Sequence, residues 1–137
     1  MSMRVLAIDD DPAMTELLSL ILKGRGFDVL TANTGADGVK IIHEAGPDVV
    51  ILDLMMPDMD GWQVCKQIRD FSNVPIVILS ALDHPGMVAS ALDAGADDYL
   101  IKPVPSGVLI AHLQKLTRRF VNTEKVDLPL HAAAAAS

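Results

Sequence analysis

The side chains best suited to chemistry in this sequence are a few polar residues that follow short apolar runs. Such runs end at the acids Asp9, Asp10 and Asp53, at Ser80 and at Lys102. Short apolar runs bounded by turn residues are typical of strands that are buried on both faces. Burying an isolated carboxylate inside such a strand would cost several kcal/mol, so we expect these side chains at the open ends of their strands.

The carboxyl ends of parallel strands lie along one edge of a sheet, where open α/β folds bind their ligands. Three carboxylates gathered there would raise one another's pKa unless a cation neutralised them. A hard divalent ion suits such oxygen ligands, and Mg²⁺ (or Mn²⁺ in its place) suits a site that keeps waters. Zinc is disfavoured, because no histidine or cysteine occupies a strand end.

Lys102 adds a compact positive charge that can pair with Asp53 or with a bound phosphoryl oxygen. A metal and an ammonium group around a carboxylate are what phosphoryl transfer to an aspartate requires. In that reaction the carboxylate attacks in line while the positive groups screen the developing charge. Ser80 can donate a hydrogen bond to the product.

An alternation of strands and helices is predicted to position these residues. Apolar runs predict strands over residues 4–9, 27–32, 48–53, 74–80 and 98–102. A helix is predicted after each strand, and Asp11, Thr34 and Asp60 are the predicted N-caps of the first three. This alternation is typical of a single doubly wound α/β domain, with a parallel sheet covered on both faces.

Apolar residues at helical spacing identify the sides of the first and last helices that we expect to be buried. In the first helix they are Met14, Leu17, Leu18, Ile21 and Leu22. The last helix begins at about Ser106, and its stripe is Leu109, Ile110, Leu113 and Leu116, with Phe120 as a further candidate. Periodicity is lost from residue 121, so the domain is expected to span 1–120 and residues 121–137 to be a linker or an artificial tail.

Composition narrows the class of protein. The chain has 137 residues, which suits one domain, and a formal net charge of −7, which argues against direct binding to nucleic acid or an anionic membrane. A single cysteine, Cys65, excludes an internal disulfide framework and fits a reducing compartment. With neither an apolar run of about 18 residues nor a signal peptide, we expect a cytoplasmic protein.

Four motifs together carry a resemblance to a known family. They are IDDDP at 8–12, DLMMPDMDG at 53–61, VPIVILSA at 74–81 and GADDYLIKP at 95–103. In this order and spacing the chain resembles a response-regulator receiver domain of the chemotaxis type over residues 3–120. The resemblance implies a flavodoxin-like sheet of five parallel strands in the order 2-1-3-4-5, flanked by five helices.

The resemblance also implies a role for each acid. Asp53 would be the phospho-acceptor in a Mg²⁺-dependent reaction. Asp10 and Asp53 would bind the ion directly, Asp9 would bind it through a water molecule, and Met55 would contribute its backbone carbonyl. The donor would be a phosphohistidine on a sensor histidine kinase or a phosphotransfer protein.

A switch is implied as well. Ser80 would move onto the phosphoryl group, Tyr99 would turn inward behind it, and Lys102 would contact a phosphoryl oxygen, with a cis bond to Pro103. The face formed by the fourth helix, the fifth strand and the fifth helix would then bind a homodimer partner or a downstream effector.

That face departs from winged-helix response regulators, many of which carry charged residues where Val88, Val108 and His112 stand in this chain. In those regulators the charges resemble the salt bridges of the active dimer. Their absence from this chain argues against that mode of dimerisation.

Three alternatives follow from the same residues. A pseudo-receiver would keep the fold as a binding module without being phosphorylated. A phosphatase of the haloacid dehalogenase type would use Asp9 and Asp11, but Ala13 stands where that pattern has a hydroxyl or branched residue. Flavodoxin-like nucleotide binding is weaker, because no glycine-rich loop follows the first strand. If the chain is a receiver domain, we expect it to catalyse only its own phosphorylation and dephosphorylation and not to be an enzyme otherwise.

Overall fold

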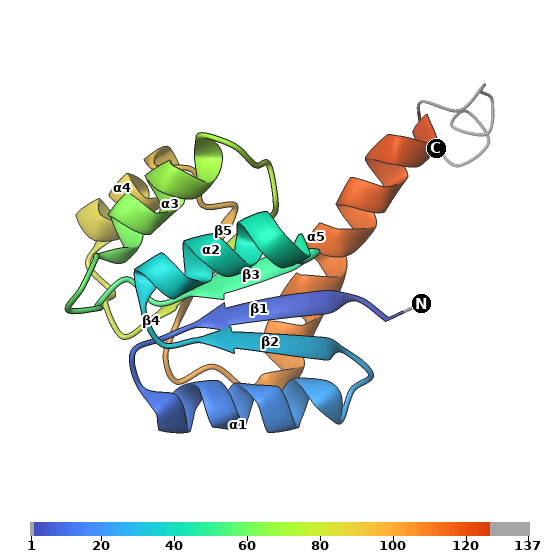
Figure 1. Ribbon diagram of the computed structural model, residues 1–137, viewed down its shortest axis with the longest axis horizontal. Helices are drawn as coiled ribbons and strands as arrows, with labels where there is room; N and C mark the ends of the chain where they lie inside the picture. The colour runs from blue at the N-terminus through green and yellow to red at the C-terminus, as the bar shows by residue number, and fades with distance from the viewer. Residues whose placement is uncertain (1, 127–137) are drawn as a thin grey trace.

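Five strands alternate with five helices along the chain (Figure 1). The strands are β1 (Arg4–Ile8), β2 (Asp28–Ala32), β3 (Val49–Leu52), β4 (Ile76–Ser80) and β5 (Asp98–Ile101). The helices are α1 (Pro12–Lys23), α2 (Gly35–Ala45), α3 (Gly61–Arg69), α4 (Pro85–Asp93) and α5 (Ser106–Val126). This computed structural model describes the backbone of residues 2–126 and the side chains of residues 2–118.

All strand pairs are parallel, and the sheet has the order β2-β1-β3-β4-β5, which confirms the predicted fold class. The chain turns from β1 to β2 on one side of the sheet and then crosses back to β3 on the other side of β1. The topological switch point therefore lies between β1 and β3, where such folds bind their ligands. Ile8 is paired with Leu52 there, so the residues that follow these two strands are neighbours.

The helices form a layer on each face of the sheet. Helices α1 and α5 cover one face, and α2, α3 and α4 cover the other (Figure 1). Alternate residues of β1 point to opposite layers: Val5 and Ala7 pack in the α1–α5 core, whereas Leu6 and Ile8 pack in the core on the other face. The strands are apolar on both faces because both faces are covered.

The predicted caps place the loops that surround the switch point. Asp11 accepts a hydrogen bond from the Ala13 N–H at the start of α1, and Asp60 accepts one from the Gln63 N–H at the start of α3. Thr34 caps α2 by accepting the N–H of Asp37 at 3.0 Å. Each cap satisfies a backbone donor that the helix itself leaves unpaired, and the three predictions are confirmed.

Arg69, at the end of α3, links three segments. Its guanidinium donates hydrogen bonds to the carbonyl oxygens of Ser72, Val74 and Gly95 and pairs with Asp97 at 2.9 Å. The same Asp97 carboxylate accepts the N–H of Ile76. One side chain thus joins the end of α3 to the start of β4 and to the α4–β5 turn.

The helices α1 and α4 each leave large apolar side chains exposed. In α1, Leu18 and Leu22 are buried as expected, but Leu17 is 50% exposed, so the prediction that Leu17 belongs to the buried stripe is wrong. In α4, Ala91 is the single buried residue, and Leu92 is exposed.

The predicted core residues of α5 are confirmed, since Leu109, Ile110, Leu113 and Leu116 are buried. The side chain of Phe120 lies outside the described residues. The backbone of α5 continues to Val126, past the expected domain boundary, and projects from the body of the molecule (Figure 1). The role of residues 121–137 stays a prediction.

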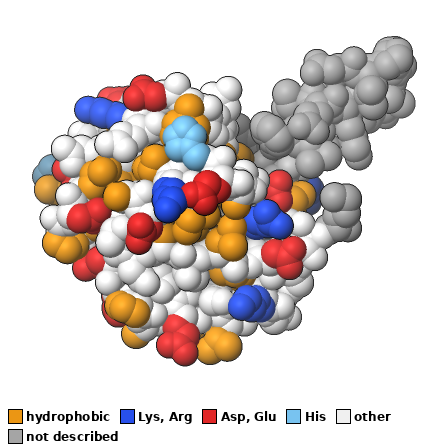
Figure 2. All heavy atoms as spheres, viewed as in Figure 1, with side chains coloured by type: hydrophobic (Ala, Val, Ile, Leu, Met, Phe, Trp, Pro, Cys, Tyr) orange, Lys and Arg blue, Asp and Glu red, His pale blue; other side chains and the backbone are white. Residues whose placement is uncertain are grey.

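The surface gives no sign of a basic binding face on the side that Figure 2 shows, where acidic and basic side chains are mixed with apolar ones. Within the described part of the chain, every helix is too short or too polar to cross a membrane.

Candidate functional site

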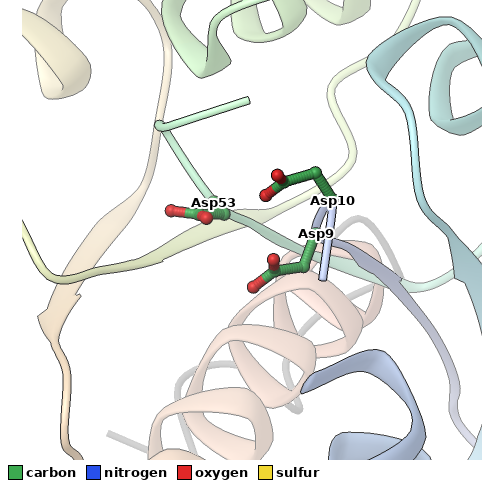
Figure 3. Close-up of side chains that lie close together, drawn as sticks. All are labelled: Asp9, Asp10 and Asp53. Atoms are coloured by element: carbon green, nitrogen blue, oxygen red, sulfur yellow. The ribbon is translucent and has the colours of Figure 1, made fainter. Parts of the chain in front are cut away.

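Three carboxylates meet beyond the ends of β1 and β3. Asp9, Asp10 and Asp53 each offer an oxygen within 4.8 Å of the others, and Figure 3 shows their side chains directed to one region. The Asp53 N–H donates a hydrogen bond to the Ile8 carbonyl at 3.0 Å, which holds the two strand ends in register. The predicted convergence of these acids is therefore present, and the donor set is all oxygen, as Mg²⁺ or Mn²⁺ prefers.

Lys102 completes the group from the end of β5. Its ammonium lies 3.0 Å from Asp9 Oδ2 and 3.9 Å from Asp53 Oδ2. Asp9 is thus the principal partner of the lysine, with Asp53 second, where the sequence suggested a pair with Asp53. The bond from Lys102 to Pro103 is cis, as the resemblance implied.

The acids differ in their exposure to solvent. Asp9 and Asp53 are buried, at 4% and 8% relative exposure, whereas Asp10 is exposed. Burial is the largest influence on Asp53 and raises the pKa of its carboxyl above the ordinary value of 3.8. The ammonium of Lys102 opposes this shift, and the negative charges of Asp9 and Asp10 add to it. A cation at this position would relieve the repulsion among the three acids.

Ser80 is the last residue of β4, and Tyr99 lies within β5, where it pairs with Ile78. Ser80 is fully buried, and its Oγ accepts the Leu82 N–H at 3.3 Å. The hydroxyl of Tyr99 donates to the Leu82 carbonyl at 2.7 Å, and partial burial raises the pKa of this phenol. Both polar groups therefore contact the loop that leads from β4 to α4. Their roles as switch residues stay predictions.

Met55 follows Asp53 in the β3–α3 loop. Its backbone N–H donates to Asp53 Oδ1 at 3.3 Å, and its side chain is exposed. This contact fixes one carboxylate oxygen of Asp53 and leaves the other toward Lys102. The Met55 carbonyl as a metal ligand stays a prediction.

Sequence reasoning missed the residues that hold these loops in place. The Asn33 amide donates to the Asp9 carbonyl at 2.8 Å and to Thr15 Oγ1 at 3.1 Å. Asp58, in a segment whose proline and glycine indicate a turn, accepts the Gly35 N–H at 3.0 Å. The one available signal was position, because Asn33 directly precedes a helix cap and Asp58 lies in the loop after Asp53.

Asp11 does not join the acid cluster. Its Oδ1 accepts the Ala13 N–H, so its carboxylate serves the start of α1. The pairing of Asp9 with Asp11 that the phosphatase alternative needs has no support from this geometry. The three acids of the cluster are Asp9, Asp10 and Asp53.

Comparisons with known proteins agree with this geometry. A family model described as the response regulator receiver domain matches residues 5–114. The chain is 37% identical over 140 residues to the DNA-binding response regulator MtrA of Mycolicibacterium smegmatis, covering 96% of this chain and 61% of that protein. It is 42% identical over 115 residues to the transcriptional regulatory protein AfsQ1 of Streptomyces coelicolor, covering 84% of this chain and 51% of that protein. The chain thus spans little more than half the length of these relatives.

Solved structures give the same result. A two-component response regulator from Clostridium difficile superposes with a TM-score of 0.84 at 30% identity, covering 87% of this chain and 98% of that one. The BeF3-activated N-terminal receiver domain of Klebsiella pneumoniae RstA gives 0.81 at 33% identity, covering 84% and 98%. The resemblance carried by the four motifs is confirmed over most of the described chain. This chain therefore belongs to the family of response regulator receiver domains.

Proposed function

We propose that this chain accepts a phosphoryl group on Asp53 from a sensor histidine kinase or a phosphotransfer protein, in a Mg²⁺-dependent reaction. The observation that carries the proposal is the convergence of three carboxylates within 4.8 Å, with the Lys102 ammonium 3.9 Å from Asp53. This arrangement puts a nucleophilic oxygen beside positive charge at the switch point of the sheet.

The residues present fit a hard divalent ion. Asp10 and Asp53 would hold Mg²⁺ (or Mn²⁺) directly, Asp9 through water, and Met55 by its backbone carbonyl. When bound, the ion supplies positive charge opposite the oxygens of the transferred phosphoryl group.

The chain's own groups account for the rest of the transfer. The free carboxylate oxygen of Asp53 forms the new bond to phosphorus while the bond from phosphorus to the donor's imidazole nitrogen breaks, and the electron pair stays on that nitrogen. Lys102, whose ammonium lies 3.0 Å from Asp9 and 3.9 Å from Asp53, would turn toward a phosphoryl oxygen on Asp53. The buried Ser80 hydroxyl would donate to another phosphoryl oxygen.

The phosphodonor has an apolar surface to dock on beside the acids. A groove of about 220 Å³ lies between α1 and the loop after β5, and its lining includes Leu17, Ile21, Val104 and Lys102. Leu17 is 50% exposed, and Leu20, one helical turn further along α1, is 68% exposed. Since Lys102 belongs both to the groove and to the site, a donor helix seated there would bring its phosphohistidine to Asp53.

The output would pass through α4, β5 and α5. Ser80 and Tyr99 both contact the Leu82 backbone, at the start of the loop that leads into α4. Each of the three elements carries an exposed apolar side chain: Leu92 on α4, Ile101 on β5 and Val108 on α5. A change at Ser80 would shift this face toward a second copy of the chain or an effector. Because its relative MtrA of Mycolicibacterium smegmatis is a DNA-binding response regulator, the effector would be a DNA-binding domain.

The test is exposure of the chain to acetyl phosphate with Mg²⁺, followed by intact mass measurement. We expect a gain of one phosphate that Asp53→Asn abolishes and that Asp37→Asn, a change in an exposed acid of α2, leaves intact. Continuous release of free phosphate from an added phosphate monoester, which is not an acyl phosphate donor, would favour the phosphatase. A bound metal without any modification would favour the pseudo-receiver.

A further inference from the structure

The segment where β2 passes into α2 contacts both halves of the acid site. Asn33, Gly35 and Ala36 lie in this segment, which we call the β2–α2 junction. One of its contacts reaches the end of β1, which carries Asp9 and Asp10, and others reach the loop after β3, which carries Asp53.

The β1 contact is made by the Asn33 side chain. Its amide donates to the Asp9 carbonyl at 2.8 Å, and the same nitrogen lies 3.1 Å from the hydroxyl of the buried Thr15 on α1. The backbone of Asp9 also donates to the Ala32 carbonyl at 3.1 Å. The end of β1 is therefore held by one hydrogen bond to the junction and by one to the last residue of β2.

The β3 contact is made by Asp58, five residues after Asp53 in the sequence. Its carboxylate accepts the N–H of Gly35 at 3.0 Å and that of Ala36 at 3.4 Å. These N–H groups begin α2, where backbone donors lack partners within the helix and the helix dipole favours negative charge. The approach is close, because a Cβ on Gly35 would lie 2.8 Å from Val64 and 3.2 Å from Met59.

Two kinds of contact hold the β3–α3 loop. Leu54 and Met56 are buried in the core, whereas Met55, Pro57 and Asp58 are exposed, so the hydrogen bonds of Asp58 to α2 add a polar contact to the apolar ones. Asp53 offers a carboxylate oxygen within 4.8 Å of Asp9 and Asp10, so the position of this loop sets the spacing of the three acids. The Met55 N–H, which fixes Asp53 Oδ1, lies in this same loop.

We propose that Asp58 is a positioning residue for phosphoryl transfer to Asp53. By accepting hydrogen bonds from the N–H groups at the start of α2, Asp58 holds the β3–α3 loop at a set distance from Asp9 and Asp10. Asn33, in the same junction, holds the end of β1. The inference rests on the proposed function and assigns Asp58 no contact with the phosphoryl group. Its loss would misplace the Met55 backbone and Asp53 together, and displacements of about 1 Å lower rates by up to about a hundredfold.

The experiment compares Asp58→Ala with Thr34→Ala. Thr34 caps the same helix through the Asp37 N–H and does not bond to the β3–α3 loop, so both variants lose a cap of α2 and should lower the midpoint of thermal unfolding by similar amounts. Phosphorylation by acetyl phosphate is followed by intact mass over a series of Mg²⁺ concentrations, and thermal unfolding is recorded for each variant. We expect Asp58→Ala to react about tenfold more slowly and to need several-fold more Mg²⁺ for half of its maximal rate.

The matched variants decide the outcome. Thr34→Ala should stay within about twofold of the wild type in both readouts, and Asp58→Asn, which keeps an acceptor oxygen, should recover most of the rate lost in Asp58→Ala. Equal rates and Mg²⁺ requirements for Asp58→Ala and Thr34→Ala would overturn the inference and leave the proposed function standing. A wild-type chain that takes up no phosphate would instead refute the proposed function, and with it this inference. Because Asp58 is exposed, its replacement removes no core packing, and folded variants are expected.

Discussion

The preference of Lys102 for Asp9 over Asp53 predicts unequal energetic coupling between the lysine and the two acids. The ammonium is 3.0 Å from Asp9 Oδ2, a hydrogen-bonded distance, and 3.9 Å from Asp53 Oδ2, which is beyond one. All three side chains are largely buried, at 22%, 6% and 10% exposure for Lys102, Asp9 and Asp53. Solvent therefore screens these pairs less than it screens a surface ion pair.

The distances give the expected sizes. At an effective dielectric constant of about 20, the charges attract by about 5 kcal/mol in the Asp9 pair and about 4 kcal/mol in the Asp53 pair, before desolvation offsets most of each. The hydrogen bond to a charged group adds about 1.5–3 kcal/mol to the Asp9 pair alone. We therefore expect coupling energies of about 2 kcal/mol for Lys102 with Asp9 and about 1 kcal/mol or less for Lys102 with Asp53.

Two double-mutant cycles measure these energies. One combines Lys102→Met with Asp9→Asn and the other combines Lys102→Met with Asp53→Asn, and urea unfolding is followed in the presence of EDTA. Lys102→Met alone should cost about 3 kcal/mol, because it leaves the buried Asp9 carboxylate without its cation. Repeating that measurement with Mg²⁺ should shrink the loss, since the ion neutralises the same acids. Coupling with Asp53 equal to or larger than that with Asp9 would refute this reasoning.

Three further predictions concern stability and dynamics. Burial raises the pKa of the Cys65 thiol from 9.0 to about 11. The stability that the neutral, buried thiol contributes to the folded state is therefore intact below pH 9 and is lost between pH 9 and pH 11, where the thiol of the unfolded chain ionises first. The wild type should lose about 1 kcal/mol more than Cys65→Ala between pH 8 and pH 10 in urea titrations, and parallel losses would contradict this. Arg69→Met should cost about 2–4 kcal/mol by leaving its backbone and carboxylate acceptors without their donor, whereas Lys66→Met on the exposed side of α3 should be nearly neutral in the same titrations. Amides of α4 should exchange hydrogen faster than those of α3, because α4 buries one residue and α3 buries four, and equal protection by mass spectrometry would count against a loosely held α4.

The acid site was predictable because its members share a simple rule. Asp9, Asp10, Asp53 and Lys102 directly follow apolar runs, and parallel strands gather whatever follows them at one edge. The position of each residue directly after a predicted strand was therefore enough to predict that these side chains lie together. The helix caps were predictable for a similar reason, since a cap acts within three residues of itself.

The features that sequence reasoning missed depend on contacts between distant segments. The pattern placed Lys102 near several carboxylates but had no means of ranking them, because the order of distances is set by the path of the chain after β5. Asn33 and Asp58 lie in loops whose composition already suggested turns, so their hydrogen bonds left no separate signal. Leu17 was assigned to the core because helical periodicity records an apolar side chain without recording whether anything covers it.

The most direct test of the central claim is to locate the phosphoryl group chemically. The chain is treated with acetyl phosphate, the acyl phosphate is trapped by borohydride reduction, and peptide masses are mapped with Mg²⁺ and with EDTA. We predict that Asp53 alone is modified and that EDTA prevents the modification. Modification of a different residue, or equal modification of Asp53 in EDTA, would contradict a metal-assisted acceptor at the junction of β1 and β3.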